Sequence, residues 1–258
     1  MYTLTLNYAT VNLACGKTLQ LKATGAPKGA ILKWRTANPD IATVSSTGVV
    51  TAKQAGLVAI SVWGPGGASD ACTVQVMFKD VTNTKDFWFE PTYYLADRDI
   101  VKGYDKQTKF KPGNDCTRSQ MVTFLWRLNQ SPEPVTKTCK FKDVKKGSYY
   151  YKAVLWAVEN GITTGITKTK FGPSGVCTRA QTVTFLWRMA GKPDPVSSKN
   201  KFIDVKSKDY FYKAVLWASE KKIVAGYKNK TFKPQGKCLR RQMVTFLYKY
   251  DKYINKKG

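Results

Sequence analysis

Three arginines occupy the same position in a repeated motif and carry the most specific chemistry in the sequence. Arg118, Arg179 and Arg240 follow one another at intervals of 61 residues, and each stands two residues before a glutamine. Each opens an apolar stretch with helical spacing, so its guanidinium stands on a first helical turn, where free amides and the helix dipole favour an anion. A guanidinium can hold a carboxylate or phosphate through two parallel hydrogen bonds. The motif therefore predicts three anion-binding positions.

Acidic residues recur with a similar period and offer the arginines another role. Asp80, Asp143 and Asp204 each stand in a Phe-x-Asp-Val motif. These carboxylates could contribute to ligand binding, could pair with the arginines to tie one repeat to its neighbour, or could cap the helix that follows. The residues alone leave the three roles open.

Two helices are expected in each repeat, and they would position these side chains. The first contains apolar residues at 93–96, 153–157 and 214–218, and the second covers 117–127, 178–188 and 239–249. The pairs Thr117 with Gln120 and Thr178 with Gln181 form capping boxes. Leu239 replaces the threonine in the third copy, so that cap is lost or supplied otherwise.

Aromatic residues fall into two groups by their surroundings. Tyr104 and Tyr227 follow glycine turns between the helices and could pack on the apolar faces of sugar rings. The second copy has Ile166 there, which predicts a weaker groove. Four tryptophans lie at helical spacing among Val, Leu and Phe and are expected in the core: Trp126, Trp156, Trp187 and Trp217.

The first 77 residues follow a different pattern, which is typical of an all-β sandwich. Short alternating apolar runs are separated by turn signals such as Asn38-Pro39 and Gly64-Pro65-Gly66-Gly67. Cys15 and Cys72 would close a loop of 58 residues, and a disulfide between them would contribute roughly 3–4 kcal/mol in the chain-entropy model. The alternative is two buried thiols.

Composition narrows the class of function. The net charge is +26, and residues 1–77 hold only 6 basic and 2 acidic side chains, so most of the excess lies in the repeats. Histidine is absent, which argues against Ser-His or Cys-His catalysis and against a common metal ligand. The six cysteines form no CxxC pair. We expect no cofactor, no metal, no membrane insertion, and an export signal already removed.

Two family resemblances follow from these motifs. The stretches Trp34–Val44, Gly48–Ala52 and Ala55-Gly56 resemble the bacterial immunoglobulin-like domain, group 2, a family of extracellular modules. The ordered series Phe-x-Asp-Val, Trp-Ala helix, glycine turn, Phe-x-Pro and Thr-Arg-x-Gln resembles the S-layer homology (SLH) domain in three tandem copies. The predicted fold is therefore multidomain, an all-β immunoglobulin-like sandwich followed by a mainly α, pseudo-threefold assembly of three helix-loop-helix repeats. The predicted boundaries are 1–77, 78–135, 136–196 and 197–258.

The SLH resemblance also implies where a ligand binds. It implies that the first helices meet around the pseudo-threefold axis, and that grooves between neighbouring repeats bind an anionic, often pyruvylated, secondary cell-wall polymer. Cys116, Cys177 and Cys238 stand where the family commonly has isoleucine and are expected to be small buried side chains, while Cys139 has no counterpart. The polysaccharide-binding residues that we predict are Arg118, Arg179, Arg240, Tyr104, Tyr227, Asp80, Asp143, Asp204, Gln120, Gln181 and Gln242.

The resulting hypothesis is a non-catalytic module that retains a protein at the surface of a Gram-positive-type bacterium by binding an acidic wall polysaccharide. Charge alone would also fit a basic nucleic-acid-binding repeat protein, although no known nucleic-acid motif is present. A third possibility is an S-layer lattice subunit or adhesin whose immunoglobulin-like domain binds a protein partner. An enzyme is less favoured, because the recurring aspartates come one per repeat rather than as a unique pair.

Overall fold

The computed structural model describes residues 2–255 and divides them into two compact units. One unit holds the N-terminal region up to Phe89 together with Lys102–Pro112, and the other holds Glu90–Val101 together with the chain from Gly113 onward. The loop between the two helices of the first repeat therefore belongs to the same unit as the strands. Within that unit the Ala55 amide donates a 2.9 Å hydrogen bond to the Gln107 carbonyl.

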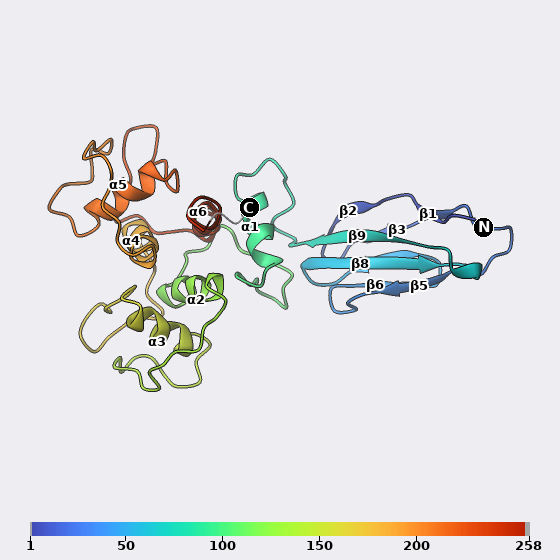
Figure 1. Ribbon diagram of the computed structural model, residues 1–258, viewed down its shortest axis with the longest axis horizontal. Helices are drawn as coiled ribbons and strands as arrows, with labels where there is room; N and C mark the ends of the chain where they lie inside the picture. The colour runs from blue at the N-terminus through green and yellow to red at the C-terminus, as the bar shows by residue number, and fades with distance from the viewer. Residues whose placement is uncertain (1, 256–258) are drawn as a thin grey trace. The chain divides into compact units, whose positions relative to one another are not determined.

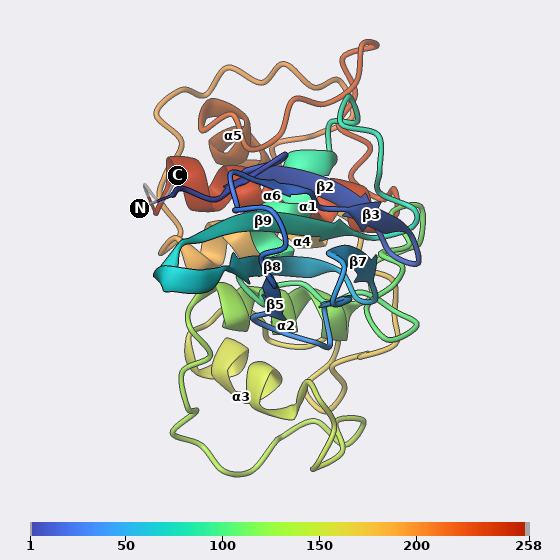
Figure 2. The same cartoon turned by 90° about the vertical axis from the view of Figure 1, so that its right-hand side faces the viewer.

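The N-terminal unit contains the strand-rich, immunoglobulin-like region. Its strands form a four-stranded sheet of order β2-β9-β8-β5, seen side by side in Figure 2, a three-stranded sheet of order β3-β7-β6, and the short pair β1 and β4. Within residues 2–255 the strands are β1 Thr5–Leu6, β2 Thr10–Ala14, β3 Thr18–Gln20, β4 Ala23–Thr24, β5 Lys33–Thr36, β6 Ala42–Val44, β7 Val49–Ala52, β8 Gly56–Trp63 and β9 Ser69–Met77.

Alternating side chains build the core of this unit. Val58, Ile60 and Val62 on β8 are buried while the intervening Leu57 and Ala59 are exposed, as expected for a half-buried strand. Gly48 closes the turn before β7 with a φ of 84°, and a Cβ there would overlap the ring of Trp34. The turn therefore requires glycine both for its backbone conformation and for space.

The predicted disulfide between Cys15 and Cys72 is wrong. Both cysteines are buried free thiols. Strand β2 runs parallel to β9 with Ala14 opposite Met77, which places Cys15 beside Phe78, whereas Cys72 lies six positions earlier along β9. Six residues of strand span roughly 20 Å, and a disulfide requires Cα atoms about 5.5–6 Å apart. The parallel pairing thus separates two cysteines that the sequence suggested could meet.

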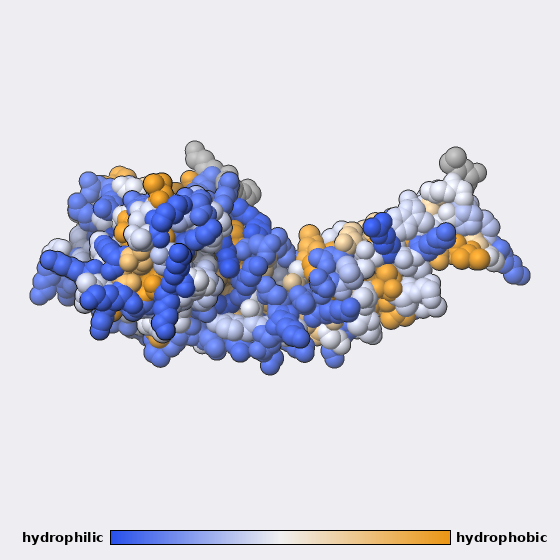
Figure 3. Space-filling model, turned by 90° about the horizontal axis from the view of Figure 1, so that it is seen from below, coloured by the Kyte–Doolittle hydropathy of each residue, from blue (hydrophilic) through white to orange (hydrophobic). Residues whose placement is uncertain are grey.

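The helical unit contains two helices per repeat, and its visible face is largely hydrophilic (Figures 1 and 3). Within it α2 packs against α3, and α4 packs against α5, so the second helix of each repeat contacts the first helix of the next. No described helix is long and apolar enough to cross a membrane. In the described part of this unit the helices are α1 Phe89–Ala96, α2 Arg118–Leu128, α3 Tyr151–Glu159, α4 Arg179–Met189, α5 Tyr212–Glu220 and α6 Arg240–Tyr253.

A ring of backbone hydrogen bonds joins the starts of the second helices. The amide of Cys177 donates to the carbonyl of Cys116, Cys238 to Cys177, and Cys116 to Cys238, at 2.8–2.9 Å. All three side chains are fully buried, as expected. The expectation that the first helices meet at the centre is wrong, because α2, α4 and α6 start from this ring and α3 and α5 lie outside them (Figure 1). A small side chain at each position lets three backbones approach closely.

Candidate functional site

Arg118 is held at the start of α2 by contacts with the following repeat. Thr117 and Gln120 form the predicted capping box, and the Arg118 amide donates to the Gly175 carbonyl at 2.9 Å. The side chain is only 5% exposed. Its Nε donates to the Phe171 carbonyl at 2.9 Å, and the guanidinium carbon lies 4.8 Å from the centre of the Phe171 ring. The arginine of one repeat is therefore built into the loop of the next.

Arg179 repeats this geometry one unit later. Its amide donates to Gly236, and its Nε donates to the Phe232 carbonyl at 2.8 Å. The guanidinium carbon lies 4.7 Å from the Phe232 ring, 5.0 Å from Tyr227 and 5.4 Å from Phe246. At 4% exposure Arg179 is as buried as Arg118. Two repeats thus hold their arginines in one geometry.

Arg240 starts α6 and is 1% exposed. Its amide donates to the Asn114 carbonyl at 2.9 Å, and its guanidinium carbon lies 5.8 Å from the Phe124 ring. Leu239 cannot accept through its side chain, but the Gln242 Oε1 still accepts from the Leu239 amide at 3.1 Å. Half of the capping box therefore survives in the third copy.

The recurring aspartates hold the loops of their own repeats. Asp143 accepts from the amides of Phe171 and Gly172 at 2.9 and 2.8 Å, and Asp204 accepts from Phe232 and Lys233 at 2.8 Å. Partial burial acts to raise the pKa of Asp143, but these amide donors outweigh it and hold the pKa below its ordinary value.

In the first repeat the same motif fixes both ends of the loop. Asp80 accepts from Phe110 and Lys111 in the same way. Phe78 packs 5.6 Å from Phe110 and beside Gly103, where a Cβ would overlap its ring. The Phe-x-Asp-Val motif therefore shapes the loop. In the second and third repeats this loop presents the carbonyl of Phe171 or Phe232 to an arginine. A direct role of the aspartates in ligand binding stays a prediction.

Neither Arg118 nor Arg179 forms an ion pair with an acidic residue in the described part of the chain. Their terminal guanidinium nitrogens also make no hydrogen bond within residues 2–255, because Nε supplies the only side-chain bond of each arginine. Burial accordingly lowers the pKa of both groups. A buried charge without a counter-charge is unfavourable until an anion reaches it.

A pocket of about 340 Å³ opens at Arg118. Its wall includes Ile166 in the turn of the second repeat, Gln181 and Arg188 of α4, and Tyr210 of the third repeat. No acidic side chain is among the described residues that line it. We call Arg118, Ile166, Phe171, Gln181, Arg188 and Tyr210 the Arg118 site. It combines two guanidinium groups with hydroxyl, amide and apolar surface, which suits a polar anionic ligand.

The equivalent Arg179 site consists of Arg179, Tyr227, Phe232, Lys233 and Gln242. Tyr227 is 38% exposed, and Lys233 places its Nζ 4.5 Å from the ring centre. Gln242 donates from Nε2 to the Tyr227 hydroxyl at 3.2 Å. The structure thus brings a predicted arginine, tyrosine and glutamine together here.

The other predicted tyrosine and glutamines have different surroundings. Tyr104 lies under Lys111 Nζ at 4.6 Å in the N-terminal unit. Gln120 and Gln181 accept from the amides of Thr117 and Thr178 through Oε1, so their side chains cap helices. Their binding role stays a prediction.

Sequence reasoning missed Arg188 and Tyr210 at the Arg118 site. Alignment of the repeats could have indicated them, since Arg127, Arg188 and Lys249 share one basic position, and Tyr149 and Tyr210 share another. Lys233 was not singled out from the sequence either. A contribution from the third repeat to a site between the first two is a property of packing and leaves no local signal.

The comparisons with protein families agree with both resemblances. The S-layer homology domain matches residues 78–122, 140–183 and 201–244, which together exceed half of the chain, and the bacterial Ig-like domain (group 2) matches residues 2–74.

Three relatives illustrate the proteins in which similar sequence occurs. An amylopullulanase of Thermoanaerobacterium thermosulfurigenes is 28% identical over 66% of this chain, and a surface-layer 125 kDa protein of Lysinibacillus sphaericus is 31% identical over 38%. A cellulosome-anchoring protein of Acetivibrio thermocellus is 23% identical over 57% of this chain. The matched regions cover 9%, 8% and 34% of those proteins, respectively.

Proposed function

Because the chain belongs to the S-layer homology domain family and carries a bacterial Ig-like domain ahead of three SLH repeats, we propose that it anchors a protein noncovalently to an acidic cell-wall polysaccharide. Surface-layer and anchoring proteins among its relatives support a cell-surface module. The chemistry of the arginine sites suits an anionic ligand, and the module acts by binding alone, without catalysis.

One observation carries the proposal. Arg118 and Arg179 are buried charges whose terminal nitrogens have no partner in the described chain, and Arg118 lines a pocket without acidic residues. A carboxylate on a sugar, such as a pyruvyl ketal, would accept two parallel hydrogen bonds from each guanidinium. Tyr227 would pack against the apolar face of the sugar ring. A ligand of this kind would supply the counter-charge that no residue of the described chain provides.

The arrangement of repeats supports binding at more than one groove. The closed ring of Cys116, Cys177 and Cys238 supports a pseudo-threefold assembly, in which the arginine of each repeat meets the loop of the next. A repeating polymer that spans two or three such grooves gains avidity well above that of one groove. Retention at the wall would then tolerate one weak site.

The test is calorimetric titration of the whole chain with purified wall polymer, before and after chemical removal of its acidic substituents. The whole chain is required because Lys102–Pro112 belongs to the N-terminal unit. We expect binding to depend on the acidic groups and to change only moderately between 50 and 200 mM salt. Equal binding of the stripped polymer, or preferential binding of DNA with a steep salt dependence, would refute the proposal in favour of a nucleic-acid-binding protein.

A further inference from the structure

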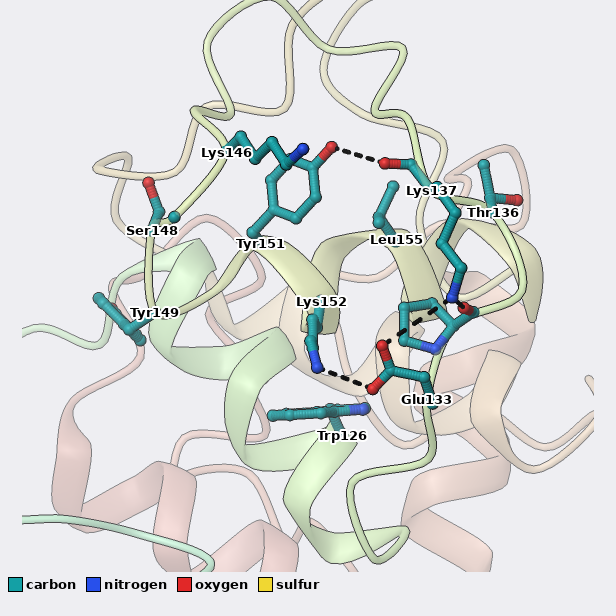
Figure 4. Close-up of a pocket in the computed structure, with 12 residues that line it drawn as sticks. Trp126, Glu133, Thr136, Lys137, Lys146, Ser148, Tyr149, Tyr151, Lys152 and Leu155 are labelled. Carbon is teal, nitrogen blue, oxygen red and sulfur yellow. Dashed lines mark hydrogen bonds and ion pairs between the residues drawn. The ribbon is translucent and has the colours of Figure 1, made fainter.

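A second pocket, of about 670 Å³, lies between α2 and the start of α3 (Figure 4). It shares no lining residue with the pocket at Arg118. Trp126 of α2 and Tyr151 and Leu155 of α3 supply its aromatic and apolar surface. The linker with Glu133 and the loop with Lys146 supply a polar rim. Its volume is in the range of pockets that hold small organic ligands.

The aromatic frame of this pocket is fixed before any ligand binds. Trp126 donates from Nε1 to the Pro132 carbonyl at 2.8 Å, and the Tyr151 hydroxyl donates to the Lys137 carbonyl at 3.1 Å. These bonds tie the linker to α2 and α3, and the one from Tyr151 to Lys137 is drawn in Figure 4. A preformed frame binds with a smaller loss of conformational entropy.

The rim carries an excess of positive charge. Three lysines, Lys137, Lys146 and Lys152, surround one carboxylate, Glu133. Lys152 pairs with Glu133 at 2.8 Å, and Lys137 lies at the limit of an ion pair with the same group, at 4.0 Å. Lys146 forms no ion pair with any described residue. The rim therefore carries two more positive charges than negative ones.

The next repeat provides an internal comparison. Its frame is the same, because Trp187 donates to Pro193 at 2.8 Å, the Tyr212 hydroxyl donates to the Ser198 carbonyl at 3.5 Å, and Lys213 pairs with Asp194 at 2.6 Å. Lys137, whose ammonium also donates to the Pro134 carbonyl at 3.1 Å, and Lys146 have no counterparts there, since Ser198 and Ser207 stand at their positions. The frame is therefore structural in both repeats, and the two lysines are not needed to build it.

We propose that this pocket is a second binding site, which takes a saccharide unit bearing a carboxylate. The sugar ring would lie against Trp126 and Tyr151, and its carboxylate would face Lys137 and Lys146. The inference rests on the proposed function for the class of ligand alone. The site would hold a further segment of the polymer that reaches the arginine grooves and would add to avidity.

The test uses trigalacturonate as the probe and the whole chain in 150 mM salt, followed by NMR of the tryptophan indole N–H signals. We expect a saturable shift of the Trp126 signal and a smaller shift of Trp187. The methyl-esterified probe should bind at least fivefold more weakly. Lys137→Ser with Lys146→Ser should weaken binding at least fivefold, while Lys28→Ser with Lys33→Ser, two exposed lysines of the N-terminal unit, removes the same charge and should change nothing.

A second variant introduces the two lysines at the equivalent positions of the next repeat, and it tests the site even if the pocket variant is altered in structure. Ser198→Lys with Ser207→Lys should increase the shift of Trp187 to that of Trp126. An unmoved Trp126 signal at saturating probe, or equal binding by the pocket variant and its control, would overturn the second site. Titration with wall polymer separates the two proposals. Loss of binding only in the Arg118 and Arg179 variants supports the arginine grooves as the anchor and rejects the pocket. Loss of binding only in the pocket variant supports the pocket and rejects the arginine grooves.

Discussion

The Arg118 and Arg179 sites make the same contacts around the arginine, which we call the arginine frame. They differ at two neighbouring side chains, which we call the site wall. In both, Nε bonds to a Phe carbonyl at 2.8–2.9 Å and the guanidinium stacks on that Phe ring at 4.7–4.8 Å. The Arg118 site has Ile166 and Gly172 where the Arg179 site has Tyr227 and Lys233. The contacts that each arginine makes with the backbone are thus retained, while two neighbouring side chains change.

The site wall of the Arg179 site also contains a residue with a strained backbone conformation. Lys233 has a φ of 56° and Lys111, its counterpart in the first repeat, a φ of 57°, whereas Gly172 at the same place has 72°. A non-glycine residue in this region costs of order 1 kcal/mol. Lys233 nevertheless lies 4.5 Å from the Tyr227 ring. The arginine contacts hold the fold together, and under the proposed function the Tyr227 and Lys233 side chains would serve binding.

The largest difference should come from the arginines themselves. Arg179→Ala should weaken polymer binding by at least about 2 kcal/mol, roughly thirtyfold, because it removes a desolvated charge. Arg118→Ala should have a smaller effect, since its site has the weaker wall. Calorimetry of both variants measures this, with Arg35→Ala on β5 of the N-terminal unit as the charge-matched control. Equal losses for Arg118 and Arg179 would show that the wall does not matter.

Next in size is the aspartate that supports each frame. Asp143→Asn and Asp204→Asn should each lower the free energy of unfolding by about 1.5–3 kcal/mol, because an amide group cannot accept both backbone N–H bonds. Urea unfolding measures the loss. Asp194→Asn, which removes a 2.6 Å but exposed ion pair, should change stability by less than about 1 kcal/mol. Losses no larger than this control would show that the loops do not depend on the aspartates.

Much of this frame could be predicted from the sequence, because it depends on local rules. The strands, the capping boxes at Thr117 and Thr178, and the buried Cys116 all follow from periodicity, side-chain chemistry or repeat position. The arginines were placed at helix starts for the same reason. Each of these features is determined within a few residues of the chain.

The parts that failed depend on pairing between distant segments. Cys15 and Cys72 were expected to meet, but the parallel register of β2 on β9 separates them. The second helices, not the first, start from the central ring, because the Cys116 segment bonds to Cys238 across 122 residues. The role of Asp143 as a loop support likewise became visible only once Phe171 and Gly172 were placed beside it.

A smaller effect is expected from acid. The folded-state pKa of Asp143 is lowered, so its contribution to stability is present above the unfolded pKa of about 3.9 and is lost as pH falls through the folded value. Buried Asp251 behaves in the same way. Burial acts to raise its pKa, but hydrogen bonds from Arg98, Asn255 and Tyr94 outweigh this effect and lower the pKa overall. The melting temperature of the helical unit should therefore fall below pH 4. Asp143→Asn should make that fall shallower, and an unchanged pH profile would contradict the assignment.

The smallest effect tests the wall alone. Ile166→Tyr with Gly172→Lys should give the Arg118 site the side chains of the Arg179 site and strengthen polymer binding about three- to tenfold, since an exposed ring face and a cation together add about 0.7–1.4 kcal/mol. Tyr227→Ile with Lys233→Gly should weaken it by a similar factor. Gly172→Lys alone serves as the control for backbone strain: it should lower stability by about 1 kcal/mol without the full gain in affinity.

The outcome of this exchange decides what the wall contributes. A gain at the first site matched by a loss at the second means that affinity follows the side chains at these two positions, because the arginine frames are otherwise alike. A loss in both variants would instead mean that each wall is fitted to its own segment of polymer, and that Ile166 and Gly172 are specific rather than weak.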